Sequence, residues 1–181
     1  TLDIAGSFIL AGMMLMAFNM FVLDKQDAEV LATNSVIRQS NISEATQLMM
    51  WDIRKIGYGT EPSKAVLKAE KNEISFLGDV YNNGSLDSVG HSFKEGISKG
   101  NNKKDMLYRS FNGTTVASDL DIRRMSFTYL DKNRNITNVG ADVKIIIVSM
   151  EFEERLVNPG DTGTTRRMDF RITPRNLFFP K

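Results

Sequence analysis

An almost unbroken run of apolar residues near the start of the chain constrains its fold more than any other feature. Ile4–Leu23 is interrupted only by Ser7 and Asn19. A run of about 20 such residues, wound as a helix, can cross the hydrocarbon core of a bilayer. No proline occurs before Pro62, so nothing forces this stretch to break. The run is therefore expected to be a helix that is buried in lipid or among other subunits.

The helix is expected to extend far beyond this run. After Leu23 the apolar residues are spaced three and four apart, as in a helix that packs on a domain along one face: Ile42, Ala45, Met49, Ile53 and Ile56. Gly57-Tyr58-Gly59 then supplies a stop. We predict one helix from Asp3 to about Ile56, roughly 80 Å long. Any break is predicted within Asn19–Asp27, and none near Asn41.

The remaining residues favour β-structure. Strands are predicted over 65–69, 74–77, 106–111, 122–130, 143–152 and 164–173. Asn112-Gly113 is a tight hairpin signal. Residues 79–103 are rich in Gly, Asn, Ser and Lys, so they are expected to be mostly loop, with one weak strand near 91–93. Val143–Phe152 is apolar on both faces, which predicts a central, covered strand with Ile147 in the core.

The predicted fold class is α+β, with a long N-terminal helix whose second half packs on an antiparallel sheet. We divide the chain into an apolar transmembrane or filament-core segment, an amphipathic helical segment and a sheet domain, over residues 1–23, 24–57 and 58–181. The division follows the change from continuous apolarity to helical spacing, and then to alternation.

Composition argues against most kinds of catalytic or cofactor site. The chain has no cysteine and one histidine, His91, so thiolate metal sites and cysteine nucleophiles are excluded and histidine-based sites nearly so. No phosphate loop, nucleophile elbow, zinc-protease or dinucleotide motif occurs. The net charge of +1 gives no general case for a nucleic-acid partner. We expect no enzyme activity, no catalytic residue, no cofactor and no metal.

Two polar loops and four arginines carry weaker signals. Asp131–Asn135 begins like an EF-hand loop, but Ile136 stands where the loop needs glycine. Tyr81–Asp87 also offers oxygen atoms, and both loops are interpreted as turns. A basic face for DNA or an anionic surface would need several arginines in line: Arg109, Arg123, Arg167 and Arg171. The near-zero net charge favours the alternative of a solvated face with acids interspersed.

Three phrases follow one another along the chain: Asp52-Ile-Arg54-Lys-Ile-Gly57-Tyr58, Phe127-Thr-Tyr129-Leu-Asp131 and Pro174-Arg175-Asn176-Leu177. With an apolar N-terminal helix that continues into a β-domain, this order resembles type IV pilins and pseudopilins, most closely those of the W and J types. The resemblance covers the helix, its exit and the last two-thirds of the sheet.

The start of the chain departs from the pilin pattern. Pilins typically begin Phe-Thr-Leu-Ile-Glu; here Thr1-Leu2 matches, but Asp3 follows and Ala5 holds the fifth place. The resemblance implies that Asp3 meets a neighbour's N-terminal amine. Val22 replaces a proline that many major pilins use for local helix melting. We expect that a leader was removed before Thr1, or that the chain starts further upstream.

We expect a structural subunit of a type IV pilus-like filament, assembled by bundling of N-terminal helices. The predicted assembly residues are Thr1, Asp3, Gly6 and Gly12, since small residues let helices approach closely. The expected partners are other copies or related pilins, the inner membrane and the pilus assembly machinery. The subunit is expected in the inner membrane and then in a surface filament. The alternatives are a single-span anchored periplasmic or surface binding domain, and a minor pseudopilin of a secretion system.

Overall fold

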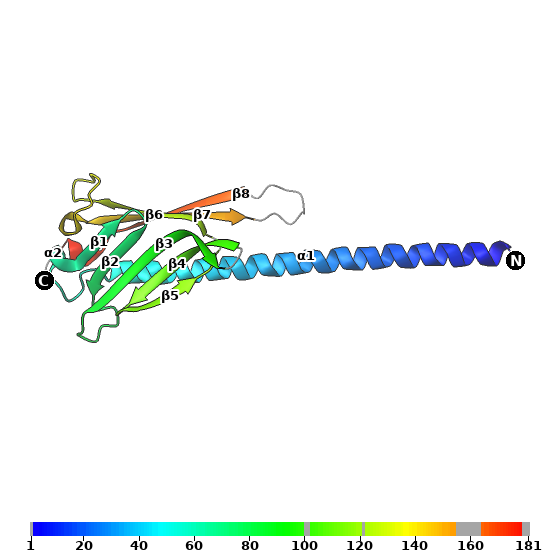
Figure 1. Cartoon of the computed structure of the whole chain (residues 1–181), viewed down its shortest axis with the longest axis horizontal. Helices are drawn as coiled ribbons and strands as arrows, with labels where there is room; N and C mark the ends of the chain where they lie inside the picture. Colours follow the sequence, from blue (N-terminus) through cyan, green and yellow to red (C-terminus); the bar gives the residue numbers. More distant parts are fainter. Residues whose placement is uncertain (1, 100–101, 121, 155–163, 179–181) are drawn as a thin grey trace.

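The amino-terminal part of the chain forms one uninterrupted helix. The computed structural model describes residues 2–99, 102–120, 122–154 and 164–178. Helix α1 spans Leu2–Arg54 and contains 53 residues. It has no break within Asn19–Asp27 and none at Asn41, so the predicted helix is confirmed, and it ends two residues before Ile56. Figure 1 shows the amino-terminal half of α1 projecting away from all the strands.

The described residues contain eight strands, which form two antiparallel sheets. The larger sheet has the order β1-β2-β3-β4-β5 and the smaller one the order β6-β7-β8. The strands are β1 Val66–Glu70, β2 Glu73–Gly78, β3 Asp87–Lys99, β4 Asn102–Phe111, β5 Thr114–Ser118, β6 Ile122–Leu130, β7 Ile145–Glu154 and β8 Thr164–Ile172. Short helices α2 (Pro62–Ala65), η1 (Gly140–Asp142) and η2 (Arg175–Leu177) complete the described elements. The α+β class is confirmed, but the single sheet that we predicted is two.

The longest strand, β3, lies where the sequence indicated a loop. It pairs with β2 on one side and β4 on the other. A strand with partners on both sides is held by main-chain hydrogen bonds, which do not depend on the side chain. The glycines and serines of this stretch therefore did not prevent a strand, and the prediction of a loop over most of 79–103 is wrong. The hairpin at Asn112-Gly113 is confirmed: φ is 47° at Asn112 and 86° at Gly113, as a type I′ turn requires.

The smaller sheet has β7 at its centre, as predicted for Val143–Phe152, although the strand begins two residues later. Its inward side chains are buried, namely Ile146, Val148, Met150 and Phe152. Ile147 has the opposite orientation and is only half-buried, so our placement of Ile147 in the core is wrong. The two faces of β7 are both apolar in sequence, and alternation alone could not tell which one meets the helix.

One core joins the helix to both sheets. Met49 and Ile53 of α1, with Ile56 just after it, are buried in the same cluster as Phe76 of the larger sheet and Val148 of the smaller one. The predicted helix stripe is thus confirmed, with Ile42 partly buried at its edge.

The helix end is fixed against β2. Gly57 has φ +77° and donates its N–H to the carbonyl of Leu77 at 3.0 Å. A Cβ on Gly78 would lie 2.3 Å from the carbonyl oxygen of Lys55, so only glycine permits this approach.

Candidate functional site

The amino-terminal half of α1 is an apolar surface without cover. Its large side chains are 58% to 78% exposed: Phe8, Ile9, Leu10, Met13, Met14, Leu15, Met16, Phe18, Met20, Phe21 and Leu23. An 18-residue window has a mean hydropathy of 1.8 with none of it buried, so the helix is long and apolar enough to cross a membrane. Monomeric soluble proteins rarely expose so large an apolar area. This segment is compatible with a membrane anchor.

The uncovered apolar surface reaches beyond the predicted segment. Val30, Val36 and Ile37 are 54% to 67% exposed, and the domain covers the helix only from about Ile42 onward. Val30, Ile37 and Leu48 are spaced seven and eleven residues apart, so they lie along one side of the helix. The cover begins at the first residue of the predicted stripe, so the helical spacing of the apolar residues did indicate where the domain starts to cover the helix.

The predicted assembly residues lie at the far end of this helix. Thr1 lies outside the described residues. Asp3 and Gly6 belong to α1, and the surroundings of their side chains are likewise outside the described part. Gly12 faces open space, since a Cβ there would meet no atom within 4 Å. The structure therefore leaves room around Gly12 for another helix, and the assembly role of all four residues stays a prediction.

A buried ionic cluster fixes the covered half of α1 to the larger sheet. The Asp52 carboxylate is fully buried and accepts Arg109 Nε at 2.7 Å and Nη2 at 3.0 Å. His91 of β3 is 2% exposed, and its Nε2 lies 2.9 Å from the same carboxylate. His91 Nδ1 is buried without a partner in the described part of the chain. The cluster links the helix to β3 and β4, so it sets the position of the domain on the helix.

The electrostatics of this cluster keep Asp52 ionised. Burial by itself would raise the pKa of the Asp52 carboxyl, but hydrogen bonds and charges from His91 and Arg109 outweigh it, and the net pKa lies below its usual value. The hydrogen bond with Asp52 raises the pKa of the Arg109 guanidinium in turn. Both carboxylate oxygens are engaged, so the cluster acts as a structural link between helix and sheet.

Sequence reasoning missed this cluster, although one signal was present. Asp52 lies at helical spacing from Met49 and Ile56 and next to Ile53, so it belongs to the apolar side of the helix. A charge on a buried face needs a partner. The identity of the partners depends on strand pairing: His91 and Arg109 are direct neighbours in the β3–β4 register. The sequence suggested a basic face of Arg109, Arg123, Arg167 and Arg171 only as the less favoured interpretation. Arg109 does not contribute to such a face, because its guanidinium pairs with the buried Asp52 carboxylate.

The outer face of the smaller sheet carries both signs of charge. Arg124 lies 3.8 Å from Glu151, and Arg167 lies 3.1 Å from Asp169. The first pair joins neighbouring strands β6 and β7, and the second joins two residues of β8. Opposite charges side by side are expected on a solvated sheet face. This arrangement supports the interpretation of a mixed surface over that of a basic strip.

The two polar loops are turns whose acids hold the backbone. Asp131 accepts the N–H groups of Asn133 and Asn135 at 2.8 Å each. Asp79 accepts those of Asn83 and Gly84 at 2.9 and 2.7 Å. Within the described residues, no group of three or more acids and histidines could hold a metal ion.

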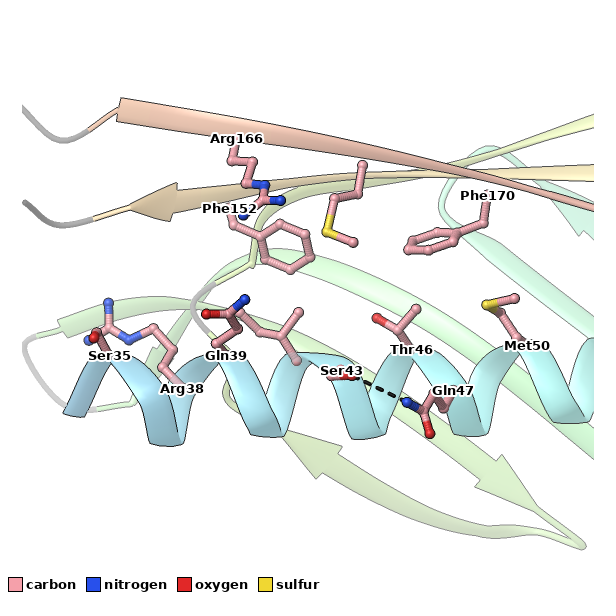
Figure 2. Close-up of a pocket in the computed structure, with 12 residues that line it drawn as sticks. Ser35, Arg38, Gln39, Ser43, Thr46, Gln47, Met50, Phe152, Arg166 and Phe170 are labelled. Carbon is pink, nitrogen blue, oxygen red and sulfur yellow. Dashed lines mark hydrogen bonds between the residues drawn. The ribbon is translucent and has the colours of Figure 1, made fainter. Parts of the chain in front are cut away.

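A groove lies where the smaller sheet diverges from α1 (Figure 2). This stem groove has a volume of about 450 Å³. Its apolar walls are Ile42 and Met50 on the helix and Phe152, Met168 and Phe170 on the strands. Figure 2 shows Arg38 and Arg166 at the end nearer the amino terminus and Met50 and Phe170 at the other. Sequence analysis did not indicate this groove, because it depends on the angle between helix and sheet.

Comparisons with known proteins leave the family of this chain open. No protein-family model, no curated protein and no solved structure matches it. The resemblance to pilins therefore rests on the short phrases and on the arrangement of helix and sheets.

Proposed function

We propose that this protein is a structural subunit of a type IV pilus-like filament, assembled through its N-terminal helix. The observation that carries the proposal is the apolar half of α1, with eleven large side chains exposed between Phe8 and Leu23. Burying one such side chain contributes about 1.5 to 3 kcal/mol, so leaving all of them in water would cost on the order of 15 to 30 kcal/mol. Lipid or other copies must therefore cover the segment.

The same segment serves two states of the subunit in turn. Before assembly it holds the chain in the inner membrane, and an assembly machine then transfers it into the filament core. Moving an apolar helix from lipid into a bundle exchanges one apolar surrounding for another, so the change in free energy is small. Gly6 and Gly12 allow close helix contacts. Asp3 needs a positive partner in such a core, and a neighbour's N-terminal amine is one candidate.

The domain forms the outer surface of the filament. Its mixed charges suit contact with water. The Asp52 cluster joins the domain to the helix through three charge-assisted contacts, so a subunit keeps one orientation of domain on helix. A fixed orientation favours assembly because every copy then presents the same surfaces to its neighbours.

Deleting Thr1–Leu23 tests this function. The shortened chain is expected to be soluble, folded and monomeric, with no filaments on cells that carry only this form, because the surface that other copies cover is gone. Electron microscopy of sheared surface material, with mass spectrometry for the chain, gives the readout, and the full-length chain is the control. Filaments of normal abundance from the shortened chain would exclude the proposal. Asp3→Ala is expected to weaken incorporation and to leave membrane insertion intact.

A second candidate is a single-span anchored domain that never polymerises, for instance a periplasmic or surface binding module. The single apolar window of α1 favours it equally, since one span is enough for an anchor. This candidate predicts that the helix contacts only lipid and that Gly6 and Gly12 are replaceable. If the full-length chain never forms filaments, the anchored domain becomes the better account. A minor pseudopilin of a secretion system would instead enter a short filament together with related subunits.

A further inference from the structure

We propose that the stem groove receives the apolar helix segment of a second copy, with the two helices parallel and Asp3 of the incoming helix at the arginine end of the groove. The inference rests on the proposed function and specifies which surfaces meet. A second copy is the expected occupant because each chain has both this groove and an uncovered apolar helix.

The groove has the size and chemistry for side chains from one face of a helix. A cavity of about 150 Å³ holds one benzene molecule, so a groove of about 450 Å³ has room for about three side chains of that size. Its strand wall is apolar, with Phe152, Met168 and Phe170. Its helix wall carries Ile42 and Met50 together with three polar residues, namely Ser43, Thr46 and Gln47. The exposed phenylalanines, methionines and leucines of residues 8–23 match the apolar part of these walls, because burying apolar groups needs no directional partner.

The direction of the incoming helix follows from its origin in a membrane. Copies that share one membrane orientation enter the filament parallel to one another, so the amino end of the incoming helix points toward the amino end of the host helix. That end of the groove carries Arg38 and Arg166, and the other end carries Met50 and Phe170 (Figure 2). The incoming helix should thus offer a negative charge first and apolar residues afterward.

Only one register meets both conditions. Asp3 is the sole acidic residue before Asp24, and residues 4–15 that follow it are apolar apart from Ser7. With Asp3 of the incoming helix beside Gln39 of the host, those residues lie beside the apolar walls. The two helices are then shifted along their axes by about 36 residues, or roughly 54 Å. A register with Asp24 at the arginines would instead bring Lys25, Asp27 and Glu29 against the apolar walls, which is costly.

An exchange of charges tests the contact in cells that assemble filaments from the full chain. Asp3→Arg is expected to lower filament yield on the order of tenfold or more, because it places like charges together at the arginine end. Adding Arg166→Asp should recover much of the yield. The matched control is Arg167→Asp, the next residue along β8, which lies beside Asp169 at 3.1 Å and does not line the groove. Membrane insertion and thermal unfolding of each variant are measured in parallel.

The outcomes separate this inference from the proposed function. Recovery by Arg166→Asp and not by Arg167→Asp supports the groove contact. Equal recovery by both, or recovery by neither while insertion and folding are normal, overturns it and leaves the filament proposal standing. If the unaltered chain makes no filaments, the proposed function fails and this contact fails with it.

Cross-linking gives a second measurement that does not depend on charge. The chain has no cysteine, so two added cysteines are the only reactive thiols. Ser7→Cys in one tagged copy and Ser43→Cys in another have the predicted offset, and Ser43 lines the groove. A disulfide requires the two Cα atoms within about 7 Å. Mild oxidation of filaments should yield a mixed dimer with Ser43→Cys and little with Glu44→Cys, whose side chain does not line the groove. The reverse preference, or no dimer with either, would contradict the contact.

Discussion

The two halves of α1 share one continuous backbone and differ in what surrounds them. Met14, in the amino-terminal half, is 78% exposed, whereas Met49, in the carboxyl-terminal half, is 2% exposed. Both are methionines in the interior of the same helix. Residue type and helical propensity are therefore equal at the two sites, and only the contacts differ. The covered half belongs to the folded core. The uncovered half is as apolar as a core, but no other part of the described chain packs against it.

The two halves of the helix therefore have separate sources of stability. The covered half is stabilised by packing on both sheets and by the Asp52 cluster. The uncovered half has only its local hydrogen bonds and propensity, which leave an isolated helix marginal in water. Lipid or neighbouring copies have to supply the rest. Equivalent substitutions in the two halves should therefore have very different effects on the free energy of unfolding of the domain.

The largest effect is expected from a charge placed in the core of the smaller sheet. Val148→Asp should destabilise the domain by about 4 kcal/mol or more and abolish its folding, since Val148 is 1% exposed. The matched control is Ile147→Asp, on the outer face of the same strand, where the side chain is half-buried and its charge stays near water. Thermal unfolding followed by circular dichroism in detergent measures both. Equal losses would mean that the outer face is also covered.

The next effect concerns the buried ionic cluster. Asp52→Asn should destabilise the domain by about 3 to 5 kcal/mol at neutral pH, because it leaves Arg109 and His91 without the carboxylate. The folded pKa of Asp52 is below its unfolded value, so its contribution is present above the unfolded pKa of about 4 and is lost as the pH falls through the folded value.

Denaturant titration of the natural protein and of Asp52→Asn over a range of pH tests whether the stabilising contribution of Asp52 is lost at low pH. The difference between the two proteins should shrink below about pH 4. Asp24→Asn, at an exposed site of the uncovered half, is the control and should leave the free energy of unfolding within about 0.5 kcal/mol. A constant difference down to low pH would show that Asp52 acts by packing alone.

Truncating a methionine compares the two halves directly. Met49→Ala should cost about 2 to 5 kcal/mol, through lost burial and a cavity, because Met49 is packed in the core cluster. Met14→Ala should leave the thermal unfolding of the domain unchanged, since its side chain has no cover. Similar losses in both variants would indicate that the uncovered half is coupled to the folding of the domain.

The smallest effect on domain stability is expected at Gly12. Gly12→Leu meets no atom within 4 Å of its new Cβ, so the free energy of unfolding of the domain should change by less than about 0.5 kcal/mol. Filament yield should nevertheless fall, because a large side chain prevents close helix approach in a bundle. Normal filaments from this variant would show that Gly12 does not lie at a helix contact. Gly12→Ala, a smaller change, should have a weaker effect.

Much of the fold could be predicted because it depends on residues close together in the chain. The absence of proline and the helical spacing of Ile42, Met49 and Ile56 predicted one helix that leaves the domain. Asn112-Gly113 predicted its hairpin, since few residue pairs adopt two positive φ values in succession. The central place of β7 followed from apolar residues on both of its faces.

Local sequence patterns were enough to predict the long helix, the Asn112-Gly113 turn and the apolar surface that has to be covered, since each depends on neighbours within a few residues. Tertiary structure alone decided the division into two sheets, the length of β3, the outward face of Ile147 and the angle that opens the stem groove. It also decided that His91 and Arg109, 39 and 57 residues from Asp52, meet its carboxylate. The physical reason is that strand pairing uses main-chain groups common to almost every residue, so the local pattern of one strand does not indicate which strand lies beside it.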